Sequence, residues 1–287
     1  MFEAGSAWYD LGLRQPKMQA AYSDQSRDPR IEDPTNLWVI HRTARALLPW
    51  ALKLGVSANA VSLVGLGFGT LAALCYFGWR DWRLASLGFL FCILWLIADG
   101  LDGMIARATG TASAFGRFMD GLCDHGVFVL LYLALGFSLG MAEIWLLMAA
   151  GGAAHALQSS LYEGERARFH RRRRGESMPP RLPSGNLLVR IYDAVANSLD
   201  RAAAPFERKL AGAVDKPRLI DRYLHLAVPP MKLQALLSGN VRVIALFAAC
   251  LADTPTLFWW FEIIILSAVA LAGILWHRHA EHSSAQP

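Results

Sequence analysis

Four aspartates that lie close together in the sequence are the residues best suited to chemistry. They fall in DGLDGMIARATGTASAFGRFMDGLCD, residues 99–124. Asp99 and Asp102 are three residues apart, so they share one face of a helix, and Asp120 and Asp124, four apart, share one face of the next. The segment between the pairs is small and contains glycine, so it can turn the chain. We therefore expect the four carboxylates to converge at one end of a helix pair.

Clustered carboxylates of this kind are expected to hold hard divalent cations, because Mg²⁺ and Mn²⁺ prefer oxygen ligands. Two such ions can clamp a diphosphate and position an attacking oxygen. Gly103 and Gly116 leave room for a nucleotide to approach, and Arg107 adds a cation for phosphate. The alternative, solvated loop charges or structural ion pairs, suits a single aspartate better than four at two helical spacings between apolar segments.

The elements that must position these residues are membrane-spanning helices. Of the 287 residues, 54% are hydrophobic and only 18% charged, against about a quarter charged in soluble domains. We expect an all-α integral membrane protein with six transmembrane helices, because six apolar segments have about the length that a bilayer requires. They lie at about 58–78, 84–105, 116–139, 143–163, 236–253 and 256–276.

The remaining chain divides around these spans. Residues 1–54 are predicted to form a cytoplasmic tail and, from Thr35 to Leu54, an interfacial amphipathic helix; a packed surface helix is the alternative. Residues 55–163 carry the first four spans and the aspartates. Residues 164–235 are read as a long, basic cytoplasmic insert with one or two interfacial helices, and 236–287 as the last two spans and a short tail. The apolar face of the interfacial helix consists of Leu37, Ile40, Leu47, Leu48, Ala51 and Leu54. The apolar face predicted in the insert consists of Leu188, Ile191, Val195 and Leu199.

Charge orients the spans. The segment from Arg166 to Lys232 holds fifteen Lys and Arg residues, whereas the short turn 79–83 holds two. The basic side is expected to be cytoplasmic, which places both termini and the aspartates there and favours the bacterial inner membrane. The net charge of +5 does not indicate a nucleic-acid partner, because the basic residues cluster beside membrane segments rather than among stacking aromatics. No cleavable signal peptide is evident, so the first span is expected to direct insertion.

The order D-x2-D-G-x2-A-R-x8-G-x3-D-x3-D resembles the signature of the CDP-alcohol phosphotransferases. The eight residues that meet it are Asp99, Asp102, Gly103, Ala106, Arg107, Gly116, Asp120 and Asp124. The segment VSANAVS before the first span also resembles the start of that family's first helix, with Asn59 and Ser62 in register. Ala58 departs from the usual proline there, which leaves the role of that turn open.

The resemblance implies a homodimer of six-helix subunits, each with a polar cavity open to the cytoplasm. It implies two Mg²⁺ or Mn²⁺ ions bound by Asp99, Asp102 and Asp120, with Asp124 as general base and further metal contact. The residues it implies for CDP are Asp99, Gly103, Ala106, Arg107, Gly116, Asn59 and Ser62. The implied reaction, in phospholipid biosynthesis, moves a phosphatidyl-type group from a lipid such as CDP-diacylglycerol to an alcohol and releases CMP.

The acceptor alcohol is left open by the sequence. Arg166 and Arg168 follow the fourth span and Arg242 lies near the start of the fifth. Three cations near the site would suit a phosphorylated acceptor such as glycerol phosphate or inositol phosphate. The competing explanation for such arginines is membrane topology and contact with lipid headgroups.

Two other functional classes are disfavoured. Membrane prenyltransferases also use aspartates, Mg²⁺ and a diphosphate donor, but they carry two separate Asp-rich motifs. The last two predicted spans of this chain contain no second Asp-rich motif. A non-enzymatic cation transporter would be expected to have acidic groups near mid-bilayer and duplicated halves. Neither feature is evident in this sequence.

Overall fold

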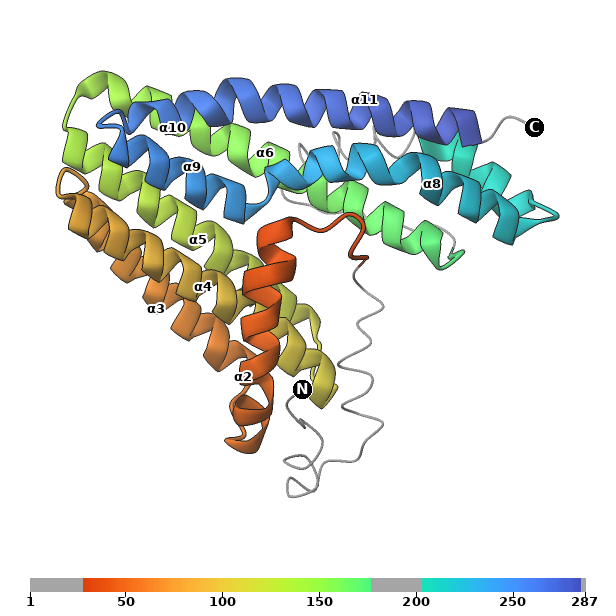
Figure 1. Cartoon of the computed structure of the whole chain (residues 1–287), viewed down its shortest axis with the longest axis horizontal. Helices are drawn as coiled ribbons and strands as arrows, with labels where there is room; N and C mark the ends of the chain where they lie inside the picture. Colours follow the sequence, from red (N-terminus) through yellow and green to blue (C-terminus); the bar gives the residue numbers. More distant parts are fainter. Residues whose placement is uncertain (1–27, 177–202, 285–287) are drawn as a thin grey trace. The chain divides into compact units, whose positions relative to one another are not determined.

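The computed structural model describes residues 28–176 and 203–284, drawn in colour in Figure 1. Within these ranges the chain consists of helices joined by short turns, and no described residue lies in a β-strand. The expected all-α fold is confirmed for this part of the chain. The helix predicted around Leu188 and Leu199 lies outside the described residues.

The chain packs into two compact units, which we describe separately. Unit 1 consists, among the described residues, of Pro34–Gly152 and Gly239–Trp260. Unit 2 consists of residues 28–33, 153–176, 203–238 and 261–284. The boundaries of these units differ from those of the four segments predicted from the sequence. The division into four segments stays a prediction.

Unit 1 carries the aspartates. Its helices are η2 (Asn36–Ile40), α2 (His41–Lys53), α3 (Ala58–Phe77), α4 (Trp82–Thr109), α5 (Ala114–Leu139), the first part of α6 (Ala142–Arg173), α9 (Gly239–Leu251) and α10 (Thr256–Trp260). The polar residues Ser57 and Ser113 begin α3 and α5, each accepting a hydrogen bond from a backbone N–H of the first turn. Buried apolar side chains, among them Trp95 and Leu131, form one continuous core between these helices.

Small residues let the central helices α3, α4 and α5 lie very close together. A Cβ on Gly69 of α3 would lie 2.2 Å from Val127 Cγ2 of α5, which no real side chain tolerates. A Cβ on Gly65 would lie 3.3 Å from Ala98 Cβ of α4. Glycine at both positions therefore allows the backbones to approach, as is typical of helix pairs in membranes. Helix α3 thus packs closely against both α4 and α5, the two helices that carry the aspartates.

The amphipathic helix predicted from Thr35 to Leu54 is present as η2 and α2, which pack against α4. Of the predicted apolar face, Ile40, Leu48 and Ala51 are buried and belong to the core of unit 1. Leu47 and Leu54 of the same face are exposed.

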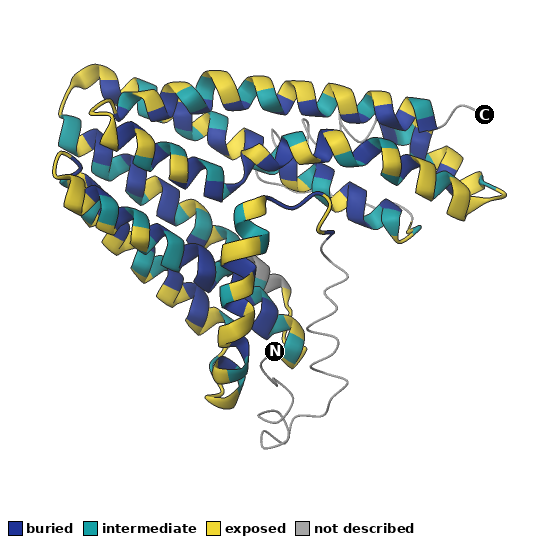
Figure 2. Cartoon of the chain, viewed as in Figure 1, coloured by how far each residue is buried: buried dark blue, intermediate teal, exposed yellow. Residues whose placement is uncertain are grey.

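Unit 2 contains the second part of α6, the helical residues 203–212, α8 (Lys216–Gln234), η3 (Ala235–Leu237), η4 (Phe261–Leu266) and α11 (Ser267–Ser284). Its core includes Phe169, Phe206, Tyr223 and Met231. Figure 2 shows the buried side of α8 and α11 in dark blue. This unit contains much of the segment predicted to be the basic insert, and α6 continues into it without a break as far as Arg173.

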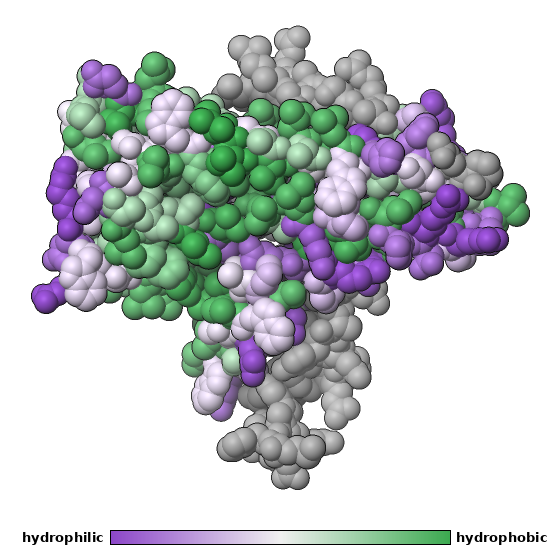
Figure 3. Space-filling view, turned by 45° about the horizontal axis from the view of Figure 1, so that its top comes forward, coloured by the Kyte–Doolittle hydropathy of each residue, from purple (hydrophilic) through white to green (hydrophobic). Residues whose placement is uncertain are grey.

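Within the described residues, four helical stretches are long and apolar enough to cross a membrane: Ala58–Phe77, Trp82–Thr109, Met119–Leu139 and Thr256–Ser284. A fifth results if Lys216–Leu237 and Gly239–Leu251, bent by 45°, form one span. Large apolar side chains on α3, such as Leu63 and Leu74, are exposed, and Figure 3 shows broad hydrophobic areas on the surface. An integral membrane protein is therefore supported, while the count of six spans stays a prediction.

Candidate active site

Three of the four aspartates come together in unit 1. Asp99 of α4 and Asp120 and Asp124 of α5 each offer a carboxylate oxygen, and these atoms all lie within 4.8 Å of one another. All three residues are half-buried. Their helical spacing puts Asp120 and Asp124 on one face of α5, and the close packing of the helices turns that face to α4.

The fourth aspartate, Asp102, is held separately by α3. Its Oδ2 accepts a hydrogen bond of 2.5 Å from the hydroxyl of Ser62. Both residues are buried, yet both line the same cavity as Asp120. Asp102 thus lies next to the group of three rather than within it, and Ser62, predicted to contact CDP, is also the partner that fixes this carboxylate.

A cavity of about 540 Å³ adjoins the aspartates. It is bordered by the end of α2, the start of α3, the end of α4 and the start of α5. Of the seven residues that the family resemblance assigns to CDP, all but Asp99 line it: Asn59, Ser62, Gly103, Ala106, Arg107 and Gly116. Residues from two motifs, the aspartate motif and the segment VSANAVS, therefore line one cavity, and they come from three helices.

Part of the cavity wall suits an anion, although the carboxylates of Asp102 and Asp120 also line the cavity. The first turns of α3 and α5 both border it, with their capping residues Ser57 and Ser113 in the lining. Helix N-termini carry partial positive charge and free N–H groups, so they attract phosphate. Arg107 adds a full positive charge to the wall formed by α4. Two helix ends and one guanidinium suit a diphosphate better than a neutral ligand.

The two glycines of the motif make room for protein atoms. A Cβ on Gly103 would lie 3.3 Å from Arg107 Nη1, so the glycine lets the guanidinium lie back along α4. A Cβ on Gly116 would lie 3.3 Å from the capping oxygen of Ser113. Each glycine therefore makes room for a polar group of the protein itself. The expectation that these glycines also leave space for the nucleotide stays a prediction.

Trp95 is a site residue that the sequence interpretation missed. Its indole Nε1 donates a hydrogen bond of 3.2 Å to Oδ1 of Asp124. Trp95 lies four residues before Asp99 on α4, and therefore on the same helical face. Extending the helical spacing of the aspartates one turn towards the N-terminus of α4 could have identified it.

The three arginines predicted for the acceptor have different surroundings. Arg166, in unit 2, pairs with Glu32 at 2.5 Å and with Glu163 at 3.5 Å. Arg168, also in unit 2, is buried and pairs with Glu165. Arg242, on α9 of unit 1, is fully buried. Arg166 is the one of the three whose side chain keeps substantial exposure, at 21%.

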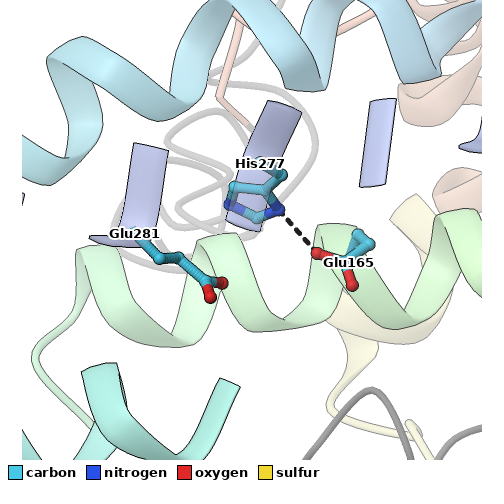
Figure 4. A group of neighbouring side chains, drawn as sticks. All are labelled: Glu165, His277 and Glu281. Atoms are coloured by element: carbon cyan, nitrogen blue, oxygen red, sulfur yellow. Dashed lines mark hydrogen bonds and ion pairs between the residues drawn. The ribbon is translucent and has the colours of Figure 1, made fainter. Parts of the chain in front are cut away.

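A second group with ligand chemistry, Glu165, His277 and Glu281, is drawn in Figure 4. His277 Nδ1 lies 2.5 Å from Glu165 Oε2, and Arg172 Nη1 lies 2.5 Å from Glu281 Oε1. Arg278 contacts both glutamates. Because guanidinium groups already neutralise both carboxylates, this cluster of unit 2 fits a buried ion-pair network better than a metal centre.

Comparison with known proteins bears on the aspartate site. Residues 55–180 match the CDP-alcohol phosphatidyltransferase family. A phosphatidylinositol phosphate synthase of Mycobacterium marinum (strain ATCC BAA-535 / M) is 30% identical over 89 residues, which cover 29% of this chain and 35% of the relative. Another, from Mycolicibacterium smegmatis (strain ATCC 700084 / mc(2)155), is 30% identical over 98 residues, covering 32% of this chain and 42% of the relative. The chain thus spans less than half the length of either relative.

Proposed function

We propose, on the premise that this chain carries a CDP-alcohol phosphatidyltransferase domain at residues 55–180, that it transfers a phosphatidyl-type group from a CDP-activated lipid to an alcohol. The donor is CDP-diacylglycerol and the second product is CMP. The observation that carries the proposal is the approach of Asp99, Asp120 and Asp124 to within 4.8 Å beside a cavity with two helix N-termini.

The donor set fits divalent metal ions. Three half-buried carboxylates within 4.8 Å repel one another, and oxygen ligands are those that Mg²⁺ and Mn²⁺ prefer. Asp99, Asp120 and Asp124 would hold these ions, with Asp102 next to them. When bound, two ions neutralise charge on the diphosphate and on the departing CMP.

The chain's own residues have distinct tasks in this reaction. Arg107 and the first turns of α3 and α5 hold the diphosphate of the donor. Asp124, oriented by Trp95, takes the proton from the acceptor hydroxyl. The hydroxyl oxygen then forms a bond to the phosphorus of the lipid phosphate, and the bond from that phosphorus to the oxygen bridging to CMP breaks. Ser62 keeps Asp102 fixed while charge shifts next to it.

For the acceptor we propose a phosphorylated polyol. The named relatives are phosphatidylinositol phosphate synthases, which favours inositol phosphate, with glycerol phosphate as the second choice. Of the three arginines predicted for the acceptor, we assign its phosphate first to Arg166, whose side chain keeps 21% of its surface exposed. If Arg242 also contributes, Arg242→Ala should raise the acceptor KM much more than the donor KM. An equal rise in both, or none, would remove Arg242 from the acceptor site.

An acceptor screen tests the proposal. Purified protein is incubated with radiolabelled CDP-diacylglycerol, Mg²⁺ or Mn²⁺, and one alcohol at a time, and the lipid product and CMP are measured. We expect CMP and a phospholipid in equal amounts with a phosphorylated polyol, and neither with chelator present. A parallel incubation replaces the CDP-lipid with a prenyl diphosphate, and its consumption without CMP release would favour a prenyltransferase instead. No turnover with either donor would contradict both enzymatic functions and leave a cation transporter as the alternative.

We also propose that the protein forms a homodimer of six-span subunits in a bacterial inner membrane, with the aspartates facing the cytoplasm. The support for the orientation is the concentration of basic residues from Arg166 to Lys232. Crosslinking in membranes, followed by sizing of the covalent product, tests the dimer.

A further inference from the structure

A second cavity lies entirely within unit 2. Its volume is about 570 Å³, and it is bordered by the end of the helical residues 203–212, the turn that follows, the first turns of α8 and Ser284, the last residue of α11. Helices α8 and α11 pack against each other, as Figure 1 shows. None of the described residues that line this cavity belongs to the aspartate motif or to unit 1. The reaction proposed above therefore does not account for it.

Cations dominate the wall of this cavity, which we name the basic cavity. Lys209 lies near the end of the helical residues 203–212, and Arg218 and Arg222 lie four residues apart on one face of α8. All three are exposed. Asp215 is the one acidic residue among the described lining residues, and it caps α8 by accepting a hydrogen bond of 3.1 Å from the backbone N–H of Arg218. Three positive charges against one negative charge leave the wall positive.

The end of α11 places the basic cavity at the level of lipid headgroups. The helical stretch Thr256–Ser284 is apolar enough to cross a membrane and has 29 residues. At about 1.5 Å per residue it is about 43 Å long, which matches the roughly 40–45 Å thickness of a bilayer with both headgroup layers. Its last residue, Ser284, therefore lies in or next to a headgroup layer, and Ser284 lines the basic cavity. The cations of the cavity are thus within reach of lipid phosphates.

The surroundings of the cations favour a lipid over a free anion. Val214, in the turn before α8, lines the basic cavity and is fully exposed. Beside a bilayer an exposed aliphatic side chain can contact acyl chains while neighbouring cations bind phosphate, whereas a soluble phosphate would gain nothing from it. Gly212 also lines the cavity, and a Cβ added to it would meet no atom within 4 Å. The wall is therefore open at this point, which leaves room for a headgroup.

We propose that the basic cavity binds the headgroup phosphate of an anionic phospholipid, with Lys209, Arg218 and Arg222 as its cationic contacts. Guanidinium and ammonium groups bind phosphate oxygens through charge-assisted hydrogen bonds, and cations beside a membrane span attract anionic lipids. A lipid with a choline headgroup carries its own cation, which the positive wall repels. The site therefore selects lipids by charge. This inference does not depend on the proposed transferase activity.

The test combines Lys209→Gln and Arg218→Gln in one full-length chain. Both residues are exposed, and the backbone N–H of Arg218 that bonds to Asp215 remains in the variant, so the midpoint of thermal unfolding should not change. The protein is purified in a neutral detergent and titrated with phosphatidylglycerol, and bound lipids are counted by native mass spectrometry. We expect one phosphatidylglycerol to bind at least about tenfold more weakly to the double variant, since each cation near a membrane surface contributes to the attraction of anionic lipids.

The matched control is Arg208→Gln with Lys232→Gln, which removes the same charge from exposed positions of unit 2 that do not line the basic cavity. It should bind phosphatidylglycerol as the wild type does, because salt limits the reach of exposed charges. A second variant, Gly212→Glu, adds a carboxylate where the wall is open and keeps every cation. It should also weaken phosphatidylglycerol binding, and it serves as the test if the double variant does not fold.

Equal phosphatidylglycerol binding by the wild type, the double variant and Gly212→Glu overturns the inference. An equal loss in the control also overturns it, because that result would indicate the overall charge of unit 2 rather than the cavity. The same holds if the wild type binds phosphatidylcholine at this site as tightly as phosphatidylglycerol. Excess inorganic phosphate separates the two sources of the anion: displacement of the lipid would assign the cavity to a soluble phosphate instead. The assay does not involve CMP release, so a failure of the proposed transferase would leave its outcome unaffected.

Discussion

The hydroxyl of Ser62 on α3 donates a hydrogen bond of 2.5 Å to Oδ2 of Asp102 on α4. The bond is buried and joins a residue of the segment that begins the first span to one of the four motif aspartates. It therefore links two motifs that lie forty residues apart in the sequence.

Ser62→Ala should weaken metal-dependent activity. A hydrogen bond to a charged group contributes about 1.5–3 kcal/mol, so the divalent cation concentration for half-maximal activity should rise about tenfold or more. A metal titration of CMP release measures it. Thr70→Val on the same helix, which removes a hydroxyl bonded to the backbone oxygen of Leu66, should leave that concentration unchanged. An unaltered titration in Ser62→Ala would show that Asp102 needs no fixed partner.

The aspartates should separate by role. Asp124→Asn keeps the shape but cannot take a proton, and general-base catalysis contributes about 10²- to 10⁴-fold in rate. We expect kcat to fall by at least that lower factor while the variant still binds CDP-lipid with metal. Asp99→Asn should lose both turnover and metal-dependent donor binding. One binding assay and one turnover assay on each variant decide the matter. Equal loss of donor binding in both would mean that Asp124 is primarily a metal ligand.

Gly69 should tolerate no side chain. In Gly69→Ala the new Cβ would lie 2.2 Å from Val127 Cγ2, and overpacking of this kind costs about 1–3 kcal/mol. The midpoint of thermal unfolding in detergent should fall, and Val127→Ala in the same chain should restore part of the loss. Gly67→Ala, on the same helix but with nothing within 4 Å of the added Cβ, is the control. Equal midpoints for the two single variants would contradict the close packing of α3 and α5.

Topology can be read from two introduced cysteines. Val214, just before α8, and Met141, in the turn between α5 and α6, are both exposed. In intact cells a membrane-impermeant thiol reagent should label Met141→Cys and leave Val214→Cys unlabelled, because we propose that the basic side is cytoplasmic. After permeabilisation both should react. Labelling of Val214→Cys in intact cells would place the aspartates on the outer face.

His170 should make unit 2 sensitive to acid. Burial, with the positive charge of Arg166 nearby, lowers the pKa of His170 to about 4; Glu32 and Asp28 act against this and Arg173 adds to it. An unfolded histidine has a pKa of about 6.5. Between these values the unfolded chain binds a proton that the folded chain does not, so the free energy of unfolding falls as pH drops from about 6.5 to 4.

His170→Gln should therefore lose less thermal stability than the wild type between pH 7 and pH 5. Unfolding in detergent at both values measures the difference. His225→Gln, at an exposed position of α8, should behave as the wild type does. A His170→Gln protein with the full wild-type loss would place the acid sensitivity elsewhere.

Much of the aspartate site follows from local spacing. Residues three or four apart share a helical face whatever the rest of the chain does, so the common face of Asp99 and Asp102 and that of Asp120 and Asp124 could be predicted from the sequence. Trp95 obeys the same rule, one turn before Asp99. The helices α3, α4 and α5 could likewise be predicted from their apolar sequences, because a bilayer requires a fixed length of apolar helix.

The sequence by itself determined the helices, the motif and the shared face of Asp120 and Asp124, since each depends on neighbours within one or two turns. That Asp99 joins these two, with Asp102 next to the group, depends on the packing of separate helices. Only the tertiary structure decided the partners of individual charges. Glu32 and Arg166 are 134 residues apart, and no periodicity in the sequence predicts that these two side chains pair. The same holds for the exposure of Leu47 and Leu54. Packing between distant segments decides which side chains meet, and this packing depends on contacts throughout the fold rather than on neighbours in the sequence.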